Sequence, residues 1–192
     1  MTNNAKIIST ETISPFRHKL HRITYERINK QNELETLTRE VYDGGNSAGI
    51  LLYNKETKTV VLTKQFRMPT FINGNESGML IEVCAGQLDH DSPEDCIRRE
   101  TEEETGYKIQ DVTKVYEAYM SPGSVSEILY LFVGAYTKEM KQGEGGGVDH
   151  GEEIDVLEIS FDEAMKMIET GEIKDAKTIM LLQYAWIKKI FE

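Results

Sequence analysis

Three glutamates near the middle of the chain have the spacing of one helical face. Residues 98–107 read RRETEEETGY, and Glu100, Glu103 and Glu104 follow an i, i+3, i+4 pattern. Like charges at this spacing destabilise a helix, and the negative C-terminal end of a helix dipole adds to the cost. A divalent cation bound by the three carboxylates would offset that cost. A solvated acidic face is the alternative interpretation for an arbitrary glutamate-rich helix.

The flanking residues predict a short helix over 93–105 with clear ends. Ser92 is a suitable N-cap, Pro93 suits the first helical position, and Asp95 completes a pair that resembles a capping box. Gly106 is a natural residue to end the helix. The glutamates therefore lie in the last two turns, where the dipole disfavours them.

The same segment resembles a known family motif. The stretch Gly86–Asp91, then Arg99-Glu100 and Glu103–Tyr107, is similar to the Nudix box, a loop–helix–loop that binds Mg²⁺ and a diphosphate. The loop after Gly86 is one residue short, Asp91 stands where the family usually has Glu, and Thr101 replaces an aliphatic residue. No primary metal ligand is lost, so the chain is identified as a member of the Nudix superfamily.

The resemblance implies a set of metal ligands and catalytic residues. Glu100 and Glu104 are the first ligands for Mg²⁺, for which Mn²⁺ can substitute, together with the backbone carbonyl of Ala85. Glu103 would bind a second ion or fix the first through water, and Arg99 would orient the carboxylates. Glu82 is a weaker candidate for a supporting role, with an ordinary polar strand residue as the alternative.

A glycine-rich acidic loop, GEGGGVDHGEEID, is the expected second part of the site. Glycines allow such a loop to move a carboxylate over bound metal, although a solvated surface loop has the same composition. By resemblance, Glu152 is the fourth metal ligand or the general base, so the expected catalytic residues are Glu152, Glu104 and Glu103. Asp149 and Glu153 remain open as the loop carboxylate.

Substrate contacts are implied for residues outside the box. Arg67 resembles a phosphate-binding arginine of the diphosphate-sugar hydrolases, and Lys177 combines a cation with a helix N-terminus. Surface or edge-strand polarity is the alternative at most of these positions. The expected substrate-binding set is Arg17, Thr38, Arg39, Glu40, Arg67, Ala85, Gly86, Gln87, Glu127 and Lys177.

Composition narrows the class of protein. The 192 residues suit one well-buried core, and the net charge of −11 argues against a nucleic-acid partner. Cys84 and Cys96 read as buried free thiols. No apolar run approaches membrane-spanning length, so no membrane partner and a cytoplasmic location are expected.

The elements that must position these residues predict an α/β fold. Helices are expected at 93–105, 161–170 and 176–190. Strands are expected at 20–27, 38–43, 48–53, 59–66, 79–85, 111–119, 127–136 and 154–159. This order predicts a mixed sheet between helices, which agrees with the α/β/α sandwich of the Nudix fold. Residues 1–44 are expected to form a separate β element that builds a homodimer by exchanging strands, and residues 45–192 the Nudix hydrolase domain.

Four further segments carry a finer resemblance: GNESGMLIEVCAG, YMSPGSVSE, GGGVDHGEEIDV and GEIKDAKT. With them, nearly the whole chain resembles the bacterial GDP-mannose pyrophosphatases of this superfamily. The resemblance implies Mg²⁺-dependent hydrolysis of GDP-mannose to GMP and mannose 1-phosphate at a site shared within a homodimer. The alternatives are ADP-ribose or another nucleoside diphosphate sugar as substrate, or a non-catalytic Nudix ligand sensor. Because a sensor has no need of all the metal ligands, the intact glutamates favour the enzyme.

Overall fold

The computed structural model describes residues 5–16, 18–148 and 151–192. The chain divides into two compact units. The N-terminal unit comprises the chain up to Asn46 together with Tyr119–Ile128, and the larger unit comprises Ser47–Ala118 and Leu129–Glu192.

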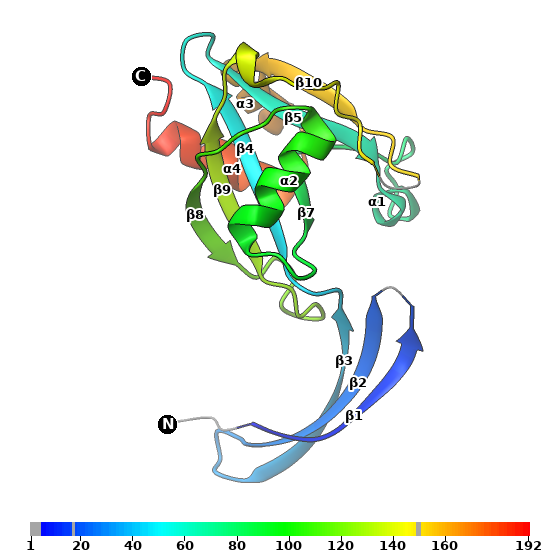
Figure 1. Ribbon diagram of the computed structural model, residues 1–192. Coiled ribbons are helices and arrows are strands. Elements are labelled where there is room, and N and C mark those ends of the chain that lie inside the picture. Colours follow the sequence, from blue (N-terminus) through cyan, green and yellow to red (C-terminus); the bar gives the residue numbers. More distant parts are fainter. Residues whose placement is uncertain (1–4, 17, 149–150) are drawn as a thin grey trace. The chain divides into compact units, whose positions relative to one another are not determined.

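The N-terminal unit is an antiparallel three-stranded sheet in the order β1 (Lys6–Pro15), β2 (Lys19–Ile28), β3 (Leu34–Asp43) (Figure 1). The segment 119–128 joins it through Tyr42, whose backbone N–H donates to Ser124 at 2.8 Å. Strand β1 was not predicted from the sequence. Its residues are mostly exposed on both faces, so the strand lacks the alternation of apolar and polar residues that marks a half-buried strand.

The larger unit is built on one mixed sheet. Its path runs β10-β5-β4-β9-β8, with β6 paired to β5 and β7 paired to β4. Strands β4 and β9 are parallel, whereas the other pairs are antiparallel. The strands are β4 (Ser47–Asn54), β5 (Thr59–Phe66), β6 (Met79–Glu82), β7 (Cys84–Gln87), β8 (Thr113–Ala118), β9 (Leu129–Ala135) and β10 (Asp155–Ser160).

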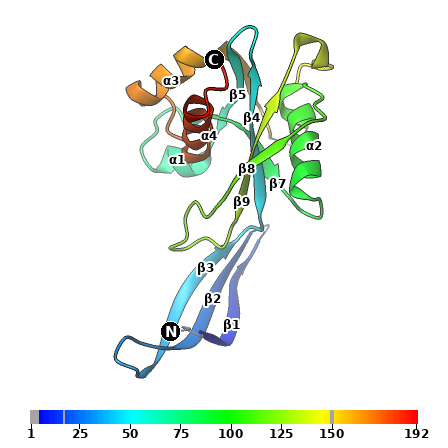
Figure 2. The ribbon, with the colours of Figure 1, turned by 90° about the vertical axis from the view of Figure 1, so that its left-hand side faces the viewer.

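Helices cover both faces of this sheet, as predicted. Helix α2 (Pro93–Thr105) lies on one face, and α3 (Phe161–Thr170) and α4 (Ala176–Ile187) lie on the other (Figure 2). The short helix α1 (Met68–Ile72) and the 3-10 turn η1 (Lys138–Met140) were not predicted. None of the helices in the described ranges is long and apolar enough to cross a membrane.

The core forms two layers around the central strand β4. Ile50 and Leu52 belong to the cluster that includes Cys96 and Ile97 of α2, and all four side chains are buried. Leu51, between them in sequence, is also fully buried. Because successive strand residues point to opposite faces, β4 is covered on both sides. Fully burying each large aliphatic side chain stabilises the fold by about 1.5–3 kcal/mol.

Local capping places the helix ends. The hydroxyl of Ser92 accepts a hydrogen bond from the Asp95 N–H at 3.1 Å, and Gly106 ends α2 with φ of 75°. The predicted bounds of α2 and α3 are confirmed. Helix α4 ends three residues earlier than expected, at Ile187, because Lys189 adopts a positive φ of 53° that no helix continues through.

Candidate metal and diphosphate site

The carboxyl group of Glu100 lies directly against the backbone of strand β7. A Cβ atom at Gly86 would collide with the Glu100 carboxyl group, so a residue without a side chain is required there. Burial raises the pKa of Glu100; Arg99 opposes this shift, and the nearby charges of Glu103 and Glu152 add to it. The side chain therefore lies in a region where negative charge accumulates.

Glu104 is the most deeply buried of the three glutamates, with 4% of its surface exposed. Its carboxylate accepts a hydrogen bond from the Ala85 N–H at 3.3 Å. Burial raises the pKa of Glu104 to about 7, with a further contribution from Glu100, against the opposing effects of Cys84, Ala85 and the Arg67 charge. The carboxyl groups of Glu100 and Glu104 thus both lie against the backbone of β7, at Gly86 and Ala85 respectively.

Arg99 organises the rest of the acidic face. Its guanidinium pairs with Glu100 at 2.9 Å, with Glu103 at 3.0 Å and with Asp91 at 3.2 Å. Asp91, the residue that departs from the family pattern, is therefore a partner of Arg99. Thr101, another departure from that pattern, is fully buried and donates its hydroxyl to the Ile97 carbonyl, which satisfies a polar group in an otherwise apolar position.

The glycine-rich loop is attached to the C-terminal end of α2. The N–H groups of Gly146 and Gly147 donate to the carbonyls of Glu104 and Glu103 at 2.9 and 3.2 Å. These are carbonyls that a helix end leaves without partners. Gly146 and Gly147 adopt positive φ values of 105° and 84° where the loop meets the helix end.

This docking brings Glu152 to the glutamates of α2. Glu152 accepts a hydrogen bond from the Val148 N–H at 3.3 Å, and its charge contributes to the raised pKa of Glu100. Asp149, one alternative loop carboxylate, lies outside the described residues.

The donor set suits a hard cation such as Mg²⁺. Glu100 and Glu104 are oxygen donors whose pKa values are raised by burial and by neighbouring carboxylates, Glu103 and Glu152 for Glu100 and Glu100 for Glu104. Positive charge would therefore stabilise their ionised forms. Within the described ranges, no three Asp, Glu, His or Cys side chains are arranged to hold a metal ion on their own. Mg²⁺ does not require this, since it usually keeps several waters and one or two carboxylates.

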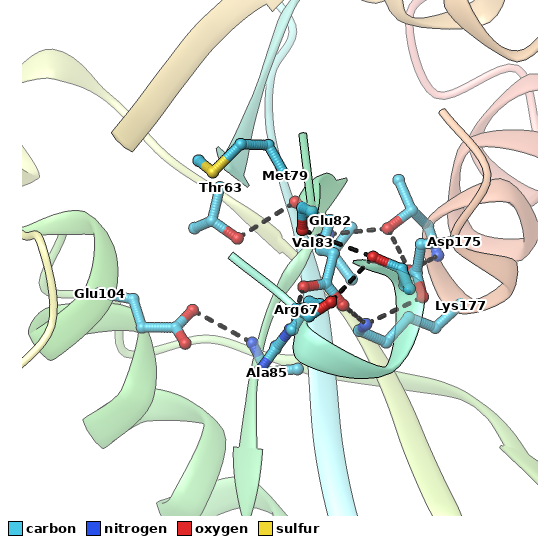
Figure 3. A network of polar contacts seen from close by, with 12 residues as sticks. Thr63, Arg67, Met79, Glu82, Val83, Ala85, Glu104, Asp175 and Lys177 are labelled. Carbon is cyan, nitrogen blue, oxygen red and sulfur yellow. Dashed lines mark hydrogen bonds and ion pairs between the residues drawn. The ribbon is translucent and has the colours of Figure 1, made fainter. Parts of the chain in front are cut away.

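A network of charged side chains, centred on the buried Glu82, lies beside the acidic site (Figure 3). Glu82, 3% exposed, accepts a hydrogen bond from Arg67 Nε at 2.6 Å on one oxygen and from Lys177 Nζ on the other. Lys177 also donates to Asp175 at 3.0 Å. Burial would lower the pKa of Lys177, but the two carboxylates outweigh it and raise the pKa. Lys177, expected as a substrate ligand, is thus held by two acids.

The same network ties helix α4 to the strand that enters the site. Asp175, the N-cap of α4, accepts from the backbone and hydroxyl of Thr178 at 2.9 and 2.6 Å. The Thr178 hydroxyl in turn accepts from the Val83 N–H at 2.8 Å. Val83 lies two residues before Ala85. This link was not predicted from the sequence, although Asp175 three residues before Thr178 is a recognisable capping pattern.

The remaining expected substrate residues are distributed over both units. Gln87 ends β7 beside Gly86 and accepts from the Cys96 thiol through its carbonyl at 3.2 Å. In the N-terminal unit, strand β3 carries Thr38, Arg39 and Glu40, and all three are exposed. Glu127 lies in the 119–128 segment of that unit. Arg17 lies outside the described residues.

Comparison with known proteins gives a domain match and relatives that align over the full chain. The model of the NUDIX domain matches residues 45–182. GDP-mannose pyrophosphatases of Shigella dysenteriae serotype 1 and Escherichia coli O157:H7 are each 49% identical over 192 residues, covering 100% of both chains. The GDP-mannose pyrophosphatase of Escherichia coli O139:H28 is 51% identical over 184 residues, covering 96% of both chains.

Among solved structures, that of an ADP compounds hydrolase superposes with a TM-score of 0.70 at 16% identity, covering 97% of this chain and 95% of the other. At this identity the similarity shows the fold, and it confirms the predicted mixed α/β architecture. The domain match and the full-length relatives establish that the chain belongs to the Nudix hydrolase family.

Proposed function

We propose that this protein hydrolyses the diphosphate bond of a nucleoside diphosphate sugar, with GDP-mannose as the substrate and GMP and mannose 1-phosphate as the products. The observation that carries the proposal is the approach of Glu100 and Glu104 to the Ala85–Gly86 backbone, with the loop that carries Glu152 docked against the end of the same helix. The printed names of the full-length relatives support GDP-mannose as the substrate.

Each residue has a proposed task in this reaction. Glu100, Glu104, Glu152 and the Ala85 carbonyl would hold Mg²⁺, with Mn²⁺ as a substitute. The bound ion would neutralise the diphosphate and polarise its phosphoryl oxygens. Glu152 would accept the proton of the attacking water, which it can approach from a loop. Arg99 would keep Glu100 and Glu103 in place, since it pairs with both.

Substrate binding falls to the cationic and backbone groups around the acidic cluster. Arg67, whose charge reaches Glu104, would bind a phosphate, and Gly86 and Gln87 would contact the substrate beside the metal ligands. Lys177 would add positive charge to the same region while it remains paired with its two acids. Further contacts are proposed for Arg17, Thr38, Arg39, Glu40 and Glu127.

We further propose that the protein is a cytoplasmic homodimer formed through its N-terminal unit. Apolar side chains of that unit, including Ile7, Phe16 and Leu34, are more than half exposed, as expected for a surface that a second copy covers. Cys84 and Cys96 are free thiols, as is usual in a reducing compartment.

A substrate panel tests the proposed reaction. GDP-mannose, ADP-ribose and UDP-glucose would each be incubated with Mg²⁺, and the products would be separated by ion-exchange chromatography. We expect GMP and mannose 1-phosphate as the main products, and loss of turnover in EDTA. Preferred hydrolysis of ADP-ribose would overturn the substrate assignment, and no turnover of any compound would overturn the activity.

A further inference from the structure

The buried carboxylate of Glu82 lies between two cationic side chains, Arg67 and Lys177, and pairs with both. Its Oε2 accepts from Arg67 Nε and its Oε1 from Lys177 Nζ (Figure 3). The side chain of Glu82 is 4% exposed, whereas that of Arg67 is 39% exposed. Only one end of this network is therefore open to a ligand, and it is the guanidinium.

The sheet register shows that this contact sets the direction of the arginine side chain. Arg67 follows β5 beside Gly78, to whose carbonyl its N–H donates at 2.8 Å. Glu82 pairs with Thr63, further back along the same two strands. The guanidinium must therefore fold back along the sheet to meet Glu82. This direction leads toward Ala85, three residues after Glu82 in the sequence.

Lys177 makes this arrangement stable. A buried carboxylate needs paired charge, and removing one partner from a buried pair is strongly destabilising. Asp175 supplies a second acid to Lys177 and caps α4. The charges alternate in sign along the series Asp175, Lys177, Glu82 and Arg67. The first of them, Asp175, is the N-cap of helix α4.

We infer that Glu82 is a positioning residue that aims Arg67 at the substrate diphosphate. This inference rests on the proposed function. Arg67 binds Glu82 through Nε, which leaves the terminal N–H groups of its planar guanidinium for phosphate oxygens. The charge of Arg67 acts on Glu104, so the guanidinium lies close to the proposed metal ligands as well as to Glu82.

A double-mutant cycle tests the link between the two residues. Glu82→Gln, Arg67→Ala and the double variant would be compared with the unmodified protein in steady-state hydrolysis of GDP-mannose. We expect Glu82→Gln to raise KM about tenfold with a smaller change in kcat, as losing a hydrogen bond to a charged group does. Because Glu82 acts through Arg67, the double variant should be no worse than Arg67→Ala within about twofold.

The matched control is Glu158→Gln. Glu158 lies on β10 and accepts hydrogen bonds from Tyr136 and Tyr107, so the change removes a carboxylate from the same sheet without touching the network. It should leave KM unchanged. An unchanged KM in Glu82→Gln, or effects of Glu82→Gln and Arg67→Ala that multiply, would overturn the positioning role.

Two further measurements keep the test decisive. If Glu82→Gln does not fold, Arg67→Lys is tested in its place. A lysine ammonium group lacks the separate Nε–H and terminal N–H groups with which a guanidinium can bind Glu82 and a phosphate at the same time. A KM near that of the unmodified protein in Arg67→Lys would then overturn the inference. The positioning role and the proposed reaction can be tested separately by measuring the Kd for GDP by calorimetry, with Ca²⁺ in place of Mg²⁺. If the effects of Glu82→Gln and Arg67→Ala on this Kd are non-additive but no nucleotide sugar is hydrolysed, the positioning role is supported and the proposed reaction is refuted.

Discussion

Glu104 is buried, and no cationic side chain in the described part of the chain forms an ion pair with its carboxylate. Its carboxylate accepts a hydrogen bond from the Ala85 N–H at 3.3 Å, and its pKa rises from 4.5 to about 7. Such a shift corresponds to about 3 kcal/mol against the ionised form. A residue that weakens the fold in this way is a candidate for function, because structural positions are readily filled by uncharged groups.

The first prediction concerns turnover. Glu104→Gln preserves the shape and the hydrogen bond from Ala85 but removes the charge proposed to bind Mg²⁺. It should fold normally and lower kcat about a hundredfold or more, as the loss of a strong electrostatic contribution does. The control is Glu102→Gln, an exposed neighbour paired with Lys108, which should keep full activity. Near-normal turnover of Glu104→Gln at saturating Mg²⁺ would discard the metal assignment.

The second prediction is a pH-dependent stability in EDTA. The folded-state pKa of Glu104 is raised to about 7 from 4.5, so the folded state binds the extra proton and stability falls as pH rises between these values. Relative to the unmodified protein, Glu104→Gln should gain up to about 3 kcal/mol at pH 8 and almost nothing near pH 4.5. Urea unfolding at both pH values measures this. An equal gain at both would show that the effect is not titration of Glu104.

The third prediction separates binding from chemistry. Arg67→Ala should raise KM more than it lowers kcat, because a phosphate contact exists in the ground and transition states alike. Glu152→Gln should lower kcat with little change in KM, since the loop carboxylate acts on the water. Steady-state kinetics with GDP-mannose decides both. If Glu153→Gln loses kcat while Glu152→Gln keeps it, the loop carboxylate is Glu153.

At the scale of elements, the C-terminal end of α2 joins the two halves of the acidic site. Its last carbonyls accept the N–H groups of Gly146 and Gly147, while the side chains of Glu103 and Glu104 point to the site. One helix end therefore fixes both the box glutamates and the loop that carries Glu152. The loop glycines are required by their backbone angles, which L-residues rarely adopt.

The fourth prediction tests this docking. A Cβ atom at Gly147, where φ is 84°, would lie 2.6 Å from Glu152 Oε2 and 2.8 Å from its Cβ. Gly147→Ala should displace Glu152 and lower kcat about tenfold or more. The protein should still fold, with a modest decrease in its free energy of unfolding. Gly143→Ala is the matched control, since its Cβ would meet nothing closer than 4.0 Å. Equal activity of the two variants would contradict the docking role.

Sequence patterns predicted those elements whose signals are local. The bounds of α2 follow from Ser92, Pro93 and Gly106, and the buried strands follow from apolar runs such as Val60–Leu62. Strand β1 was missed because its pairing with β2 is not accompanied by burial. The ion network was missed because Glu82 and Lys177 are far apart in sequence, and the packing of α4 against the sheet brings them together.

At the scale of the whole molecule, the N-terminal unit is a sheet without a helix layer. Its three strands expose apolar side chains such as Ile7 at 63%, Phe16 at 81% and Leu34 at 64%. Strand β1 forms one edge of this sheet, and an unpaired edge is a template for pairing with another chain. These features support the proposal that the unit forms the homodimer and contributes residues 38–40 to a shared site.

The last prediction is therefore about assembly. Deleting residues 1–40 should give an aggregating protein or an inactive monomer, because the dimer surface is lost and the rest of the unit is left unpaired. Light scattering coupled to size-exclusion chromatography would give the mass, and GDP-mannose hydrolysis the activity. The control is Ile187→Asp, which changes an apolar residue of comparable exposure, 64%, in helix α4 and should leave both unchanged. A soluble, fully active monomer after the deletion would rule out a shared site, since every residue that the larger unit needs for catalysis would then lie within it.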